Sequence, residues 1–312
     1  MSALRFVTFG ALASLACASV AIGAATVAAP PVAKPVAHSA AATTIPANLP
    51  SLSAQQIAER NVAARGGLAA WQKVSAMTLA GKLDAGKERK DGGEIAVITN
   101  YQARALERAK MRKALEEGKT PVPEVAKVIQ LPFQMDLKRP TLMRLEIPFQ
   151  GQTAIQVYDG KNGWKLRPYL GRHEVEPFSS EELKLAASQQ ELDGALVNYQ
   201  AKGTRVELDG TEMLEGHGNY RLKLTLKSGD VRHLWVDGQT FLETRIEGAP
   251  RRWDGKLRTV YTWYRDYKSV DGLQVAHRLE TQLSGVPGTE NVYIEHVVLN
   301  PLLDSTRFSK PI

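Results

Sequence analysis

Histidine is the residue type best suited to acid–base or metal chemistry near neutral pH, and the chain contains six. They are His38, His173, His217, His233, His277 and His296. No two stand at the spacing of a metal-binding HxxxH pair, and the single cysteine cannot form a CxxC pair. The glycine-rich phosphate loop, the dinucleotide-binding fingerprint and the GxSxG and HExxH motifs are also missing. We therefore expect no metal ion, no cofactor and no enzymatic activity.

Two histidines fall on the apolar positions of predicted strands. His277 and His296 alternate with polar residues in the way that buried strand positions do. We expect both to be neutral, hydrogen-bonded residues of the core. Acidic residues are plentiful, but a catalytic carboxylate pair would have to be assembled in space, and no spacing identifies one. A hydrolase without cofactor is therefore the least favoured of three functional alternatives.

Aromatic side chains gather in the second half of the chain. One predicted strand carries Tyr261, Trp263, Tyr264 and Tyr267, and another carries Trp235. Because successive side chains of a strand point to opposite faces, Tyr261 and Trp263 share one face and Tyr264 lies on the other. Each face of this strand therefore presents an aromatic ring.

The elements that would position these side chains are mostly strands. Residues 220–227 alternate apolar and basic or polar side chains, as expected of a half-buried strand, and the same period appears in 129–137, 143–147, 273–279 and 292–298. Asp-Gly pairs at 159, 209, 237, 254 and 271 lie between or beside such runs and favour tight hairpins. About ten strands with short turns predict a mainly β (α+β) antiparallel sheet, which must curl strongly or close.

Three segments predict helices. Ser53 and Gln56 have the spacing of a capping box at the start of one helix, which should break at Gly66-Gly67 and resume around Trp71. Residues 103–118 form a basic helical insertion between two strands, and residues 179–192 form another helix with two acidic residues in its first turn. Both helices could cover the mouth of a curled sheet.

The N-terminal region predicts export. Residues 1–25 combine one basic residue, an apolar run and small residues at the cleavage site, as a secretory signal peptide does. Residues 26–52 are rich in Ala and Pro and predict a flexible linker, so a single domain occupies 53–312. We expect a periplasmic location by a cleaved signal peptide. Lipid attachment at Cys17 is the alternative that its leader position leaves open.

The charge balance limits the partners. The formal net charge is +7, and the Lys and Arg residues are scattered along the predicted strands rather than clustered. A mild positive excess favours anionic surfaces such as lipid head groups, whereas nucleic-acid binding proteins concentrate their basic residues. We therefore expect no nucleic acid partner.

Several segments resemble the LolA-like family of outer-membrane lipoprotein-sorting proteins. The resemblance spans about 53–312 and rests on turn and packing residues. The matching segments are 61–67 with Trp71, 157–164, 234–237, 264–273 and 299–308.

The resemblance implies a strongly curved, unclosed antiparallel β-sheet, a half-barrel, with helices covering its concave face. In that family the hollow accepts the acyl chains of lipoproteins or other amphiphiles for transit across the periplasm. An arginine holds the cover shut in the classical carrier, and Arg139 and Arg144 are candidates for it here. The basic insertion at 103–118 and the long linker depart from the compact carriers.

These observations predict a monomeric carrier or sensor that binds a lipid or an acylated lipoprotein in a hydrophobic cavity, for outer-membrane sorting. Envelope membrane proteins are further candidate partners. The alternative is a non-transport interaction module of the cell envelope, with a filled core. Strand parity selects the residues expected to line the cavity. They are Met143, Leu145, Ile147, Leu222, Leu224, Leu226, Trp235 and Trp263.

Overall fold

The computed structural model describes residues 49–87, 116, 128–168, 172–189 and 192–312. The predicted signal peptide, most of the linker and, apart from Glu116, the insertion at 103–118 lie outside this part of the chain. The last linker residues do lie within it, and there Leu49 and Leu52 pack against the domain, while the Tyr220 hydroxyl donates to the carbonyl of Pro50 at 2.7 Å.

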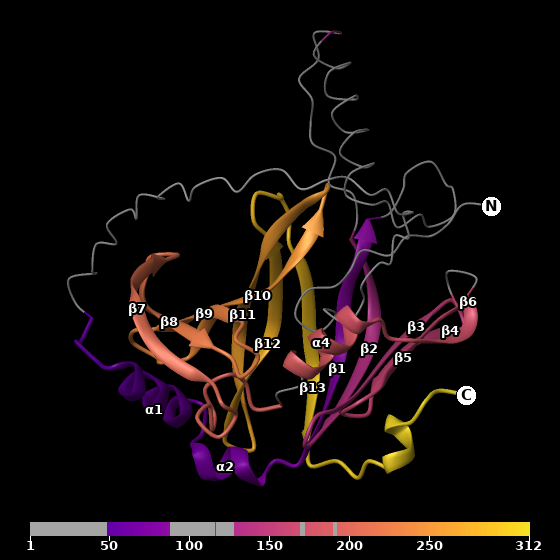
Figure 1. Ribbon diagram of the computed structural model, residues 1–312, viewed down its shortest axis with the longest axis horizontal. Helices are drawn as coiled ribbons and strands as arrows, with labels where there is room; N and C mark the ends of the chain where they lie inside the picture. Colours follow the sequence, from indigo (N-terminus) through magenta and orange to yellow (C-terminus); the bar gives the residue numbers. More distant parts are fainter. Residues whose placement is uncertain (1–48, 88–115, 117–127, 169–171, 190–191) are drawn as a thin grey trace, which may run out of the picture.

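The described chain forms a single 13-stranded antiparallel sheet that does not close (Figure 1). The strands are β1 (Ala76–Lys87), β2 (Val128–Lys138), β3 (Leu142–Phe149), β4 (Gln152–Tyr158), β5 (Gly163–Arg167), β6 (Arg172–Pro177), β7 (Arg205–Leu214), β8 (His217–Thr225), β9 (Val231–Asp237), β10 (Glu243–Trp253), β11 (Lys256–Val270), β12 (Leu273–Leu283) and β13 (Glu290–Leu299). They lie in the order β6-β5-β4-β3-β2-β1-β13-β12-β11-β10-β9-β8-β7, so β6 and β7 are the edges. The mainly β, curved and unclosed sheet is confirmed.

The register gives the sheet one continuous, mostly apolar face, which we call the inner face because the helices pack against it. Residues paired directly across antiparallel strands share a face. One row on the inner face runs through Leu222, Leu234, Ile246, Thr262 and Thr281. A second row runs through Leu279, Val292, Leu83 and Leu131. The opposite side of the sheet is the outer face.

Three helices lie against the inner face: α1 (Ala54–Ala64), α2 (Leu68–Lys73) and α4 (Ser180–Gln189). Ile57 of α1 is buried with residues of β8 and β9, and Trp71 of α2 and Ala186 of α4 are buried with residues of β1 to β3. Figure 1 shows α4 in the hollow between the two halves of the sheet. A short 3-10 helix, η2 (Ser305–Phe308), follows β13. Within the described chain, no helix combines the length and apolarity needed to cross a membrane.

The junction between α1 and α2 follows from its sequence. The capping box is present, because Ser53 accepts from the Gln56 N–H and Gln56 accepts from the Ser53 N–H. Gly66 has a φ of 109°, and a Cβ there would stand 2.5 Å from the carbonyl oxygen of Gly272, so only glycine fits. Trp71 then turns back into the core and donates from its indole to the carbonyl of Arg65 at 3.1 Å.

One expected histidine lies in the core and the other does not. His277 is buried and its Nδ1 lies 2.9 Å from the carbonyl of Val275, as predicted. The prediction for His296 is wrong: its side chain is exposed. The pairing of β13 with β1 shifts between Ala80 and Gly81, and this bulge moves His296 and Val298 to the outer face.

The core packing predicts that truncating a side chain lowers the free energy of unfolding far more on the inner face than on the outer face. Leu145 on the inner face is 2% exposed, whereas Val298 on the outer face is 50% exposed. We expect Leu145→Ala to lower the free energy of unfolding by about 2–5 kcal/mol, because truncation leaves a buried cavity. Val298→Ala should change it by less than about 0.5 kcal/mol. Urea denaturation of both variants measures this, and equal losses would contradict the assignment of the faces.

Candidate ligand site on the inner face of the sheet

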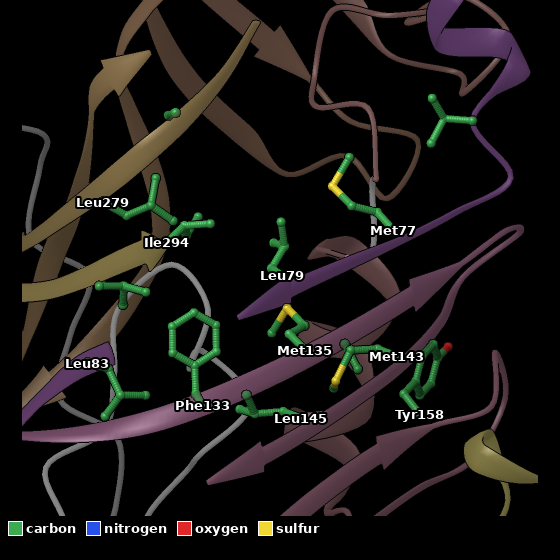
Figure 2. Packing of buried hydrophobic residues seen from close by; sticks show 14 of the residues in the cluster. Met77, Leu79, Leu83, Phe133, Met135, Met143, Leu145, Tyr158, Leu279 and Ile294 are labelled. Carbon is green, nitrogen blue, oxygen red and sulfur yellow. The ribbon is translucent and has the colours of Figure 1, made fainter. Parts of the chain in front are cut away.

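Half of the inner face is formed by strands β1 to β3 with β12 and β13. Met143 and Leu145 are buried there and Ile147 packs against them from the margin. Figure 2 shows Met143 and Leu145 beside Met135, with Phe133 and Leu83 further along the same cluster. The cluster consists almost entirely of hydrocarbon and thioether side chains, which suit contact with another apolar molecule.

The other half of the inner face lies under α1. Leu222 and Leu224 of β8 are buried there against Ile57, and Leu226 packs at the margin. The three leucines share a face with the β3 triplet through the continuous register, but they belong to a separate cluster of buried residues. Six of the eight residues selected by strand parity therefore lie on one face, in two groups.

Trp235 and Trp263 are not brought together with those six. Both pair with Arg245 of β10, which places them on the outer face. There the Arg245 guanidinium lies 3.9 Å from the centroid of Trp235 and 5.0 Å from that of Trp263. These cation–π contacts account for the aromatic residues on the outer face of β11, whereas Tyr264 packs against the inner-face cluster.

Helix α4 covers the first half of the inner face with small and polar side chains. Between residues 180 and 187 of this helix, Glu182 and Ala186, one turn apart, are buried, and Leu183 is partly buried beside them. Glu182 closes a capping box with Ser179 and pairs with Lys165 of β5 at 2.6 and 2.7 Å. The two side chains are 0% and 4% exposed. The helix is therefore fixed by a buried ion pair in addition to its apolar contacts.

This ion pair has a particular energetic character. Two charges that leave water lose hydration free energy, which their mutual attraction only roughly offsets. Breaking such a pair by removing one partner leaves an uncompensated buried charge, whereas removing both charges is often neutral or stabilising. The ion pair therefore fixes the position of α4 but adds little to the free energy of unfolding.

A second polar network connects the segment after α4 to the turn after β2. The Asp193 carboxylate accepts from Arg139 and from Lys202, each at 2.7 Å. Arg139 also donates to the carbonyls of Val74 and Trp71 at the end of α2. Of the two arginines proposed to hold the cover, Arg139 therefore connects the end of α2 to the segment after α4. Arg144 instead lies on the outer face, bound to Glu146 and the Arg307 carbonyl.

The same network continues into the sheet through Arg65. Its guanidinium donates to the Asp193 carbonyl at 2.7 Å and to Glu243 of β10 at 3.1 Å, and it lies over the Trp71 ring. The Tyr267 hydroxyl donates to Glu243 at 3.1 Å. Burial, together with the charge of Glu243, raises the pKa of Tyr267 well above 10.0, so the phenol keeps its proton. Sequence reasoning missed this network because its directly bonded members are separated by up to 178 residues.

Two pockets of about 430 and 440 Å³ open at the surface of the described structure. The first lies between α1 and the segment at 196–201, and the second lies mostly on the outer face beside Pro132, Pro148 and Ile155. Neither is lined by the β3 or β8 triplets. Among the described residues, no three His, Cys, Asp or Glu side chains gather in a group that could hold a metal ion.

The chain matches no family model and no curated protein. It is similar to several solved structures. A LolA superfamily protein of Nitrosomonas europaea is 16% identical, over 83% of this chain and 99% of that chain, with a TM-score of 0.49. A DUF1329 family protein of Desulfovibrio piger is 14% identical, over 82% and 95%, with a TM-score of 0.48. A domain of Vibrio parahaemolyticus named for outer membrane lipoprotein sorting is 12% identical, over 82% and 96%, with a TM-score of 0.47. The LolA-like family named from the sequence is thus the family of the first of these structures.

The Asp193 network predicts a pH dependence. Burial raises the pKa of Asp193, but Lys202 and Arg139 outweigh it and lower the pKa below 3.8. A lowered pKa gives stability that is complete above the ordinary pKa and is lost as the pH falls through the folded value. We expect Asp193→Asn to lower the free energy of unfolding by about 3 kcal/mol at pH 7, because two cations lose their buried partner.

Denaturation curves of the wild type and of Asp193→Asn between pH 7 and pH 2 measure this effect. The difference between the two proteins should stay constant down to about pH 5 and shrink below pH 4. A difference that grew towards low pH would contradict the assigned direction of the pKa shift.

Proposed function

We propose that the protein is a periplasmic carrier or sensor that binds the acyl chains of a lipid or lipoprotein against the inner face of the sheet. The observation that carries this proposal is the mismatch between the inner face and its cover. The inner face is apolar along Met143, Leu145 and their neighbours, but α4 adds only Ala186 and the partly buried Leu183 to this cluster and is fixed over β5 by the Glu182–Lys165 ion pair. A permanent core helix usually presents a stripe of large apolar residues instead.

Magnitudes support an exchange of α4 for an acyl chain. Transfer of one methylene from water to an apolar environment is worth about 0.8 kcal/mol, so ten methylenes give about 8 kcal/mol. The apolar contribution of α4 comes mainly from Ala186, Leu183 and Leu185, of which only Ala186 is fully buried. At about 1.5–3 kcal/mol for one fully buried leucine, this contribution is smaller than that of the acyl chain.

The remaining parts of the proposal follow from the sequence. A signal peptide at 1–25 exports the chain, and a single domain from 53 onward acts without cofactor as a monomer. The family resemblance makes lipoproteins the first candidate cargo and outer-membrane sorting the process. Envelope membrane proteins would then load and unload the carrier. No enzymatic step is needed, since binding and release are both non-covalent.

One observation favours the alternative of a non-transport interaction module. In the described structure the inner face is packed by the protein's own side chains, with Met143 and Val197 fully buried. A module of this kind would keep α4 in place and use an outer surface for its partner. The two functions differ in whether α4 moves.

Lipid binding is tested on protein purified from the periplasm without detergent. We expect mass spectrometry to find bound lipid, and a fluorescent fatty acid to bind the delipidated protein and raise its melting temperature. Ile147→Glu places a charge at the margin of the inner face and should weaken this binding at least tenfold. Val298→Glu is the matched control on the outer face and should leave it unchanged. If neither lipid nor probe binds, the carrier function is wrong.

Two variants of the Lys165–Glu182 ion pair test whether α4 moves aside, because they should change the stability of the closed form and the rate of fatty-acid entry in opposite directions. Lys165→Met alone leaves Glu182 charged without its partner, so the closed form should lose about 3–5 kcal/mol and the fatty acid should enter faster. Lys165→Met with Glu182→Gln removes both charges and keeps a capping residue. This double variant should be at least as stable as the wild type, and the probe should enter more slowly. Stopped-flow fluorescence measures both rates, and equal rates would support the interaction module.

A further inference from the structure

The hairpin between β10 and β11 ends in a tight turn that its sequence specifies. Asp254 and Gly255 have φ values of 49° and 73°, as a two-residue type I′ turn requires. The residues before and after the turn pair directly. The pairs are Trp253 with Lys256, Arg252 with Leu257 and Arg251 with Arg258.

This end of the hairpin extends beyond its neighbours in the sheet. Pairing of β10 with β9 reaches Ile246, and pairing of β11 with β12 reaches Val260. Within the described chain, the ladder of residues 251–258 therefore runs only between β10 and β11, and we call these residues the hairpin tip. Figure 1 shows both strands reaching the upper end of the sheet. At its base the tip is braced by an Arg251–Glu290 ion pair and a hydrogen bond from Arg258 to the Ser284 carbonyl, both at 3.4 Å.

The side chains of the tip combine positive charge with an exposed leucine and a half-buried tryptophan. The tip contains three Arg, one Lys and a single acid, Asp254. Leu257 is 64% exposed, and Arg252 and Lys256 are exposed beside it. Cross-strand pairing puts Arg252 with Leu257 on one side and Trp253 with Lys256 on the other. One side of the tip thus carries one basic and one apolar residue, and the other carries Trp253 with three basic residues, because Arg251 and Arg258 lie on the side of Lys256.

We propose that the hairpin tip docks the protein on an anionic lipid membrane. Basic side chains would contact the head groups, while Leu257 and Trp253 enter the boundary between head groups and acyl chains. Tryptophan favours this boundary because its ring is apolar and its N–H can remain hydrated. An exposed leucine does not fit a purely electrostatic partner such as nucleic acid, since phosphates interact with the basic residues alone. The charge of the tip is complementary to an anionic surface.

This docking goes beyond the proposed carrier function and does not depend on it. A carrier must reach a bilayer to exchange its cargo, but the tip would bind an empty bilayer whether or not the inner face accepts an acyl chain. Vesicle binding by the tip and fatty-acid binding by the inner face are therefore measured separately. Either result can fail while the other holds.

Co-sedimentation of the exported chain with phosphatidylcholine vesicles containing one quarter phosphatidylglycerol tests the proposal. We expect the wild type to bind these vesicles and not pure phosphatidylcholine, and the tryptophan emission to shift to shorter wavelength. Lys256→Gln with Leu257→Ala should weaken binding at least tenfold, since one basic residue alone contributes about fivefold. Trp253→Phe should retain binding and remove most of the emission shift.

The matched control removes one apolar and one basic residue at the opposite end of the sheet. Leu302 is fully exposed after β13, and Lys310 is exposed near the C-terminus. Leu302→Ala with Lys310→Gln should bind vesicles like the wild type. The proposal is overturned if both double variants lose binding equally or if the wild type binds no vesicles.

Discussion

The continuous register of one antiparallel sheet decides the position of almost every side chain with a role in this protein. In the described part of the chain thirteen strands pair in an unbroken order, so direct cross-strand partners carry one row of leucine, isoleucine and threonine from β8 to β12 and an apolar row from β12 to β2. A shift of one residue would exchange the inner and outer faces beyond that point. The bulge near His296 produces such an exchange locally, and β13 then continues with Val297 and Leu299, partly buried, against the core.

A sheet that is apolar on one side must be covered, and this chain covers it in two different ways. Under α1, Ile57 and Ala58 pack against the leucines of β8 and β9, which is ordinary apolar burial. Under α4 the contact includes a buried Lys165–Glu182 pair, and the segments around it are tied by Arg139, Asp193 and Arg65. Because polar contacts are directional, the second cover has a defined closed position without a large gain in stability.

Structure that depends on residues near one another in the sequence was predictable, whereas contacts between residues distant in the sequence were not. The alternation of residues 220–227, the capping box at Ser53 and the break at Gly66 each depend on near neighbours, and all three were predicted. The count of about ten strands was low because β5 and β6 are short and charged, without clear alternation. Lys165 and Glu182 each resemble surface residues in the sequence, since only the tertiary fold shows that they meet.

The open ends of the sheet have a consequence for behaviour at high concentration. An unpaired edge strand offers free backbone N–H and C=O groups to any extended chain, which is a route to aggregation. Here β6 is six residues long, carries Arg172, His173 and Glu174, and ends in Pro177. The register of β7 shifts between Leu208 and Thr211, where Gly210 has a positive φ, and charged residues precede the bulge. Both borders therefore discourage the stacking of one molecule's sheet onto the next, so the sheet can stay open without seeding fibrils.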